Sequence, residues 1–239
     1  STSADKNDKV SDKLDATRKL TVAVLPSHVE NASDDVKKAY TQAIEALKAQ
    51  GHEILERELM DAKFDISAYY ITATAEAATN LARYDGIRYG NRITGKNLED
   101  TFIQTRSNGF GDEVKRRIML GNFVLSSGYY EAYYVKAQKT RHMIKDQYDK
   151  IFADVDLILS PIAPGTAPKV GELENPMDMY LSDLYSISVN LAGLPALCLP
   201  INKGENGMPV GLQLIAKAYD EQTLFDGAIS LEKQINYNS

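Results

Sequence analysis

The stretch LTVAVLP (20–26) is a continuous apolar run that ends at a proline. Such a run is typical of a strand that is buried on both faces of a sheet. Apolar residues then recur at helical spacing over 34–49, where Gly51 ends the expected helix, and HEILEREL (52–59) follows as a second strand. This strand–helix–strand order predicts two parallel strands joined by a right-handed crossover.

The rest of the chain continues the alternation of helices and strands. Further helices are expected over 61–84, 98–107, 111–121, 128–153, 179–192 and 220–235, the third and fourth pivoting near Gly121 or Gly128. Further strands are expected at VDLILSP (155–161), LPALCLPI (194–201) and PVGLQLIAK (209–217), with Asn206-Gly207 favouring a tight hairpin between the last two. The expected fold class is therefore α/β, a mixed β-sheet flanked by helices. The polar residues 1–18 are expected to be a linker or frayed end, and the length of the chain allows one large or two small domains.

Composition excludes several classes of protein. The 239 residues carry a formal net charge of −6, so we do not expect the chain to grip a nucleic-acid backbone by itself. The single cysteine, Cys198, excludes a disulfide scaffold and a cysteine-based zinc site. The longest mainly apolar stretch, 187–201, is too short and too interrupted to cross a bilayer. The first twenty residues lack the apolar core of a secretory signal, and we expect a cytoplasmic protein that does not associate with membranes.

The usual signs of a catalytic or metal centre are weak. His28, His52 and His142 share no ligand spacing, so no metal site is expected. Ser126 and Ser127 are the tempting nucleophiles, but no histidine, lysine or aspartate is placed nearby in the sequence to activate them. Their context, VLSSGYYEAYY, indicates a helix entry that Ser127 caps and in which the tyrosines pack.

Charged side chains in two segments are candidates for binding a free amino acid. Arg116 and Arg117 are adjacent, so on a helix they point about 100° apart and one of them can turn inward. Asp183 precedes an apolar stretch and can also face inward. Facing one cavity, an arginine and Asp183 offer a fork for a carboxylate and an acceptor for an ammonium group. The competing interpretation is that each forms a structural ion pair, and the residues alone leave both open.

Five motifs resemble the C-terminal half of amidase-signature proteins: NLARYDGIRYG (80–90), GFGDEVKRRIMLG (109–121), SSGYYEAYY (126–134), NLAGLPAL (190–197) and PVGLQLI (209–215). NLAGLP and PVGLQ are shared by the wider superfamily. YDGIRYG together with EVKRRIMLG is narrower and is similar to the A subunits of the glutamyl-tRNA(Gln)/aspartyl-tRNA(Asn) amidotransferases. The resemblance runs over about residues 1–235, essentially the whole chain, and implies that 19–239 are the C-terminal portion of an amidase-signature domain.

The resemblance implies a glutaminase. In this family a serine attacks the side-chain amide of glutamine, with a second serine and a lysine as the proton relay. Ammonia leaves, and water then releases glutamate from the acyl-enzyme. The resemblance places the lysine and the serines upstream of this chain, so we expect it to hold no catalytic residue and to be inactive alone. By the same resemblance, Arg117 binds the α-carboxylate of glutamine, Asp183 binds the α-ammonium, and Tyr69 lies near the glutamine.

The resemblance also implies partners. The ammonia passes to the B subunit, which uses ATP and Mg²⁺ to activate the glutamate of mischarged Glu-tRNA(Gln), giving Gln-tRNA(Gln). The C subunit holds the A and B subunits together, and no cofactor is expected in this chain itself. Two alternatives stay open: another amidase-signature hydrolase that acts on a different small amide, and a non-catalytic α/β binding module.

Overall fold

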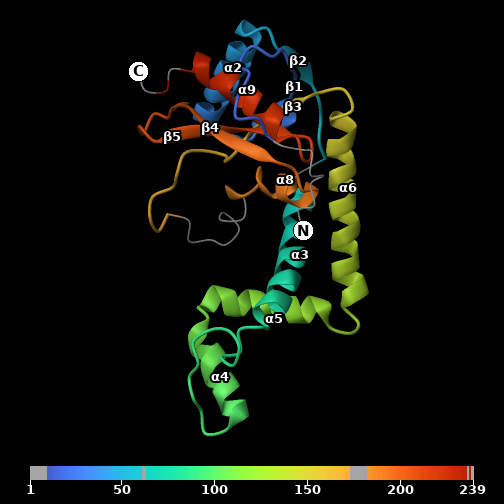
Figure 1. The fold of residues 1–239 in the computed structure, drawn as a ribbon, viewed down its shortest axis with the longest axis vertical. Helices are drawn as coiled ribbons and strands as arrows, with labels where there is room; N and C mark the ends of the chain where they lie inside the picture. The colour runs from blue at the N-terminus through green and yellow to red at the C-terminus, as the bar shows by residue number, and fades with distance from the viewer. Residues whose placement is uncertain (1–9, 61–62, 173–181, 236, 238–239) are drawn as a thin grey trace. The chain divides into compact units, whose positions relative to one another are not determined.

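The computed structural model describes residues 10–60, 63–172, 182–235 and 237 (Figure 1). The chain divides into two compact units, one formed by residues 1–66 and 142–239 and the other by residues 67–141. No helix of the described residues is long and apolar enough to span a membrane.

The first unit is built around a five-stranded mixed sheet, as the sequence predicts. Its strands are β1 (Thr21–Val24), β2 (Glu53–Glu56), β3 (Leu157–Pro161), β4 (Ala196–Lys203) and β5 (Pro209–Ala216), in the order β2-β1-β3-β5-β4. β1 runs parallel to β2 and β3, whereas β5 is antiparallel to both β3 and β4. The predicted hairpin between β4 and β5 is confirmed, and Gly207 in its turn adopts a left-handed φ of +77°.

Helices cover both faces of this sheet. α2 (Asp34–Ala49) and α9 (Glu221–Gln234) lie on one face, and the short α8 (Ile187–Ala192) lies on the other (Figure 1). The helix predicted over 34–49 is confirmed at both ends. Ser33 caps it by accepting a hydrogen bond from the N–H of Val36, and two aspartates in the first turn complement the helix dipole. A short helix, α1 (Pro26–Val29), follows β1 directly.

The core lies between the sheet and the pair α2 and α9. Its large side chains that are almost wholly removed from solvent include Leu47, Leu157, Leu159, Leu212, Leu214 and Leu231. Burying one such side chain stabilises the fold by about 1.5–3 kcal/mol. The stability of the first unit therefore depends on the apolar runs that predict its strands.

The described part of the polar N-terminal segment is anchored to α9. The N–H of Ser11 donates to Gln222 and the N–H of Asp15 donates to Asp226. Arg18 forms an ion pair with the buried carboxylate of Asp226, at an N···O distance of 3.3 Å.

The second unit is helical. It contains most of α3 (Lys63–Leu81), α4 (Leu98–Gly109), α5 (Asp112–Leu125), the π-helix η1 (Tyr130–Val135) and the start of α6 (Lys136–Ile151). The helices predicted over 61–84 and 98–107 are found with small shifts of their ends. The helix predicted over 111–121 continues past Gly121, and the chain instead turns at Ser126–Gly128, where Gly128 adopts a φ of +87°.

The reason for Gly121 is close packing. A Cβ at this position would stand 2.0 Å from the carbonyl oxygen of Thr74 and 2.7 Å from the Cβ of Ala78, both on α3. Only a residue without a side chain lets α5 pack this closely on α3. The glycine therefore fixes the packing distance of two helices rather than ending one of them.

Within its described residues, the helix predicted over 179–192 is interrupted by a turn at 183–186. Residues 179–181 lie outside the described residues, and most of 182–186 form a turn. The carbonyl of Asp183 accepts hydrogen bonds from the N–H groups of Ser186 and Ile187, and α8 begins at Ile187.

Candidate functional site

Arg117 lies on α5, one helical turn after Glu113. Its Nε donates to Oε1 of Glu113 at 2.9 Å, and Nη1 of Arg116 donates to the other carboxylate oxygen at 2.6 Å. The side chain of Arg117 is 40% exposed and that of Arg116 is 68% exposed. Of the two adjacent arginines, Arg117 is thus the less exposed, and Glu113 is its anionic partner within the chain.

Two tyrosines of α3 adjoin Arg117. The Cζ atom of Arg117 lies 6.0 Å from the centroid of the Tyr70 ring, at the limit of a cation–π contact. Tyr69 packs edge-on against Tyr70, with ring centroids 5.2 Å apart and an interplanar angle of 83°. Tyr69, Tyr70, Glu113, Arg116 and Arg117 therefore form one group, which we call the Arg117 cluster.

The charges in the Arg117 cluster support one another. The hydrogen bond from Arg117 holds the pKa of Glu113 below its ordinary value, against the opposing effect of burial. The same bond raises the pKa of Arg117, and the nearby Tyr69 and Tyr70 add to the effect. Both side chains are therefore ionised at neutral pH, as a hydrogen-bonded ion pair requires.

Asp183 belongs to the other unit. Its side chain is exposed, and its backbone carbonyl forms the turn that precedes α8. Arg117 and Tyr69, in contrast, both lie in the helical unit. The structure thus brings Tyr69 and Arg117 together and sets no distance between either of them and Asp183.

The two adjacent serines have structural surroundings. The hydroxyl of Ser126 donates to the carbonyl of Phe123 at 2.7 Å, at the end of α5. The predicted cap by Ser127 is wrong, because Tyr129 occupies the cap position of η1 and no side chain caps that helix. Ser126 is instead the C-cap residue of α5, where its hydroxyl donates to one of the last backbone carbonyls of that helix.

The histidines also have structural surroundings. Nδ1 of His52 accepts from the N–H of Leu20 at 3.1 Å, and Nε2 lies 2.8 Å from the hydroxyl of Ser230. The ring nitrogens of His28 are buried without a hydrogen-bond partner among the described residues, and burial lowers the pKa of His28. Within the part of the chain that the structure describes, no group of three metal-binding side chains occurs.

A hollow of about 390 Å³ lies elsewhere in the helical unit. Its lining comes from α3, α5 and η1 and consists of Ala75, Glu76, Thr79, Asn80, Leu125 and Tyr134. None of the Arg117 cluster lines it, so it adds no group to the candidate site.

Glu113 is the member of the cluster that the sequence motifs did not single out. Its spacing to Arg117 is i,i+4, with the acidic residue on the N-terminal side, which is the favourable order for an ion pair on a helix. That spacing was the signal that could have found it.

The comparisons with known proteins agree with the resemblance seen in the motifs. A protein-family model described as Amidase matches residues 1–225. The chain is 79% identical, over all its 239 residues, to the A subunit of glutamyl-tRNA(Gln) amidotransferase from Sulfurimonas denitrificans, and it covers 54% of that protein. It is 63% identical to the same subunit of a Nitratiruptor species, over 92% of this chain and 50% of that protein. The chain therefore spans about half the length of the curated relatives it matches.

Solved structures of related proteins are similar to this chain in fold. The crystal structure of the A subunit of glutamyl-tRNA(Gln) amidotransferase from Thermotoga maritima is 33% identical, with a TM-score of 0.69, over 92% of this chain and 43% of that chain. An allophanate hydrolase of Kluyveromyces lactis, 22% identical with a TM-score of 0.67 over 91% of this chain and 32% of that chain, shares the fold. The mixed sheet with its flanking helices and the family match over residues 1–225 together show that this chain belongs to the amidase family.

Proposed function

We propose that this chain is the substrate-recognition half of the glutaminase subunit of a glutamyl-tRNA(Gln) amidotransferase. The observation that carries the proposal is the 79% identity, across the whole chain, to the A subunit of that enzyme in Sulfurimonas denitrificans. Such a subunit releases ammonia from glutamine, and the ammonia converts Glu-tRNA(Gln) to Gln-tRNA(Gln) elsewhere in the complex.

Arg117 binds the α-carboxylate of glutamine. Its Nε is engaged by Glu113, and the other N–H donors of a guanidinium lie on its two Nη atoms, which match a carboxylate in a bidentate pair. Tyr69 packs against Tyr70, whose ring lies near this guanidinium, and it forms a wall near the substrate. Asp183, exposed just before α8, binds the α-ammonium group.

The nucleophile lies outside these 239 residues. Within the described residues, the hydroxyl of Ser126 is bound to a backbone carbonyl rather than to a base that would activate it. We therefore expect the chain alone to release no ammonia from glutamine. In the cytoplasmic complex, the B subunit uses ATP with Mg²⁺ to activate the glutamate of Glu-tRNA(Gln), and the C subunit joins the two larger subunits.

The test uses a full-length chimera in which this chain replaces the corresponding half of the Sulfurimonas denitrificans protein. The chimera is co-expressed with the B and C subunits of that organism. Conversion of Glu-tRNA(Gln) is then measured with glutamine and, separately, with ammonium chloride as the nitrogen donor. Because ammonium bypasses the glutaminase, variants of the recognition residues affect only the first reaction.

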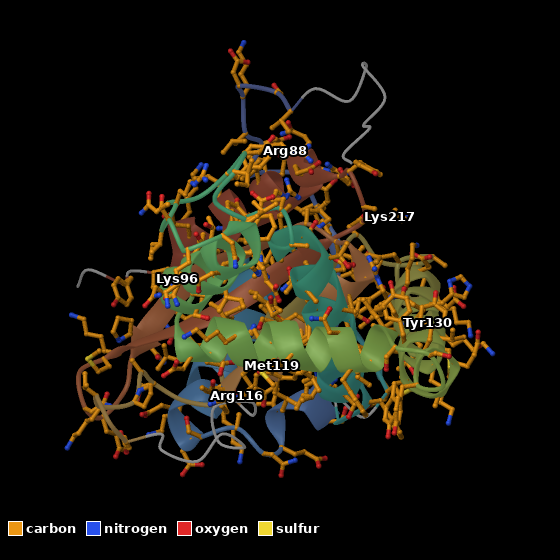
Figure 2. All side chains as sticks on the ribbon, turned by 90° about the horizontal axis from the view of Figure 1, so that it is seen from below. Arg88, Lys96, Arg116, Met119, Tyr130 and Lys217 are labelled. Atoms are coloured by element: carbon orange, nitrogen blue, oxygen red, sulfur yellow. The ribbon has the colours of Figure 1, made fainter. Side chains whose placement is uncertain are left out.

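The variants are Arg117→Ala and Asp183→Asn, with Arg88→Ala as the control. Arg88 is an exposed arginine of the helical unit, outside the Arg117 cluster (Figure 2). Both recognition variants are expected to lose glutamine-dependent conversion and to keep ammonium-dependent conversion, and the control is expected to keep both. Undiminished use of glutamine by Arg117→Ala and Asp183→Asn would overturn the proposal.

A further inference from the structure

Glu113 is held at both of its carboxylate oxygens by arginines of its own helix. Oε1 accepts from Nε of Arg117 at 2.9 Å, and Oε2 accepts from Nη1 of Arg116 at 2.6 Å. Figure 2 shows Arg116 on α5, where its side chain is largely exposed.

This arrangement orients the guanidinium of Arg117. The hydrogen bond to Glu113 uses Nε, so it does not consume the N–H donors on the two Nη atoms. The ring of Tyr70 lies near the same guanidinium, with its centroid 6.0 Å from Cζ. An arginine that is already ordered by such contacts loses less side-chain entropy when it binds an anion.

Arg116 also preserves the charge that an anion needs. A carboxylate beside Arg117 would by itself cancel the positive charge of that arginine. With Arg116 on the second oxygen, two positive charges and one negative charge leave the trio with a net charge of +1. The cluster therefore remains attractive to a carboxylate.

Stability alone does not explain the pair. The side chains of Glu113 and Arg117 are 53% and 40% exposed, and ion pairs at that exposure contribute little to folding. The effect of Glu113 is therefore expected on how Arg117 is presented, rather than on whether α5 folds.

We propose that Glu113 is a positioning residue that presents Arg117 to the α-carboxylate of the substrate. This inference rests on the function proposed above. Glu113 does not touch the substrate, and its contribution is to the preference for amides that carry an α-carboxylate.

The experiment uses the full-length chimera in complex with the B and C subunits. Glutaminase rates are measured for glutamine and for 4-aminobutanamide, which is glutamine without its α-carboxylate. The variants are Glu113→Ala, Glu113→Gln and Arg117→Ala. Asp112→Ala is the matched control, because it removes a carboxylate from the same first turn of α5 that pairs with Lys115 and not with an arginine.

Glu113→Ala is expected to raise the KM for glutamine by about three- to tenfold, with kcat changed by less than about twofold. The analogue should be used as well as before, so the preference for glutamine falls by the same factor. Glu113→Gln should recover part of the loss, because its amide oxygen can still accept from Nε of Arg117. Asp112→Ala should change the KM and kcat for neither substrate.

Three outcomes overturn the inference. An unchanged KM in Glu113→Ala, with a raised KM in Arg117→Ala, removes the positioning role and leaves the proposed function standing. A lowered KM in Glu113→Ala would show that Glu113 competes with the substrate for Arg117. If Arg117→Ala itself leaves the KM unchanged, the proposed function has failed as well.

Discussion

The contact at Gly121 predicts that the smallest possible enlargement of this residue disturbs the helical unit. In Gly121→Ala, the new Cβ would stand 2.0 Å from the carbonyl oxygen of Thr74. A carbon and a carbonyl oxygen normally stay about 3.3 Å apart, so α5 would have to move by about 1.3 Å. Because the obstacle is helix backbone, it cannot rotate away as a side chain could.

The expected loss of stability is about 2 kcal/mol. Overpacking at a rigid contact costs up to about 3 kcal/mol, and alanine regains about 1 kcal/mol over glycine inside a helix. For a chain of this size, the midpoint of thermal unfolding should fall by about 4–8 °C. Since α5 carries Arg117 and α3 carries Tyr69, the KM for glutamine of the chimera should rise as well.

Gly109→Ala is the matched control for Gly121→Ala. Gly109 is the last residue of α4, and a Cβ there would have nothing within 4 Å. We expect this variant to be as stable as the parent protein or slightly more stable. Calorimetry on both variants decides the matter. A Gly121→Ala protein that unfolds at or above the temperature of the parent would refute the close-packing argument.

Three further predictions concern the first unit of the chain, residues 1–66 and 142–239, which we call the sheet-containing unit. Burial lowers the pKa of His28 from 6.5, so the unfolded chain binds more protons and stability falls as the pH drops through 6.5. In urea unfolding, His28→Phe should therefore lose less stability between about pH 7 and 5 than the parent, and an equal loss in both proteins would contradict this reasoning. Tyr40→Phe removes a buried hydroxyl that joins the N–H before α1 to a carbonyl of β3, and should cost about 1–3 kcal/mol in urea unfolding, whereas the exposed Tyr219→Phe should cost almost nothing. Among the described residues β4 pairs only with β5, and its apolar outer edge should make the isolated chain self-associate. Cys198→Lys should reduce this association in sedimentation measurements, and equal association of Cys198→Lys and Cys198→Ser would contradict the edge as its cause.

The elements of the sheet-containing unit could be predicted because their signals are local. The helix over 34–49 carries its own cap at Ser33 and its own stop near Gly51, and the apolar runs of β1, β3 and β5 are largely buried where the sequence expects it. In the hairpin, Asn206-Gly207 supplies the turn chemistry directly. Such features need no knowledge of the distant chain.

The features that could not be predicted depend on tertiary contacts. Gly121 is of the residue type that commonly ends a helix, but its role is set by Thr74, a residue 47 positions earlier in the chain. The residues of the π-helix η1 are ordinary helix-compatible types, and no periodicity in them distinguishes it from an α-helix. The division of the chain into two units likewise has no mark in the composition.

The binding roles of Arg117, Asp183 and Tyr69 stay predictions, and the structure adds what surrounds two of them. Arg117 is less exposed than Arg116, and Tyr69 packs against Tyr70, whose ring lies near Arg117. The ion pair with Glu113 was offered only in general terms, as a structural partner of one of the arginines. In the structure both interpretations meet at one residue, because Arg117 has an internal partner and still carries further donors for an anion.

The measurement that would decide whether this segment recognises glutamine is the coupling between Arg117 and the α-carboxylate. The quantity kcat/KM is determined for glutamine and for 4-aminobutanamide, in the chimera and in its Arg117→Ala variant. If Arg117 binds the α-carboxylate, removing either partner should cost nearly as much as removing both, with a coupling free energy of about 2–4 kcal/mol, or roughly 30- to 900-fold. Strictly additive losses, with a coupling near zero, would show that Arg117 does not bind this group and would contradict the proposed recognition.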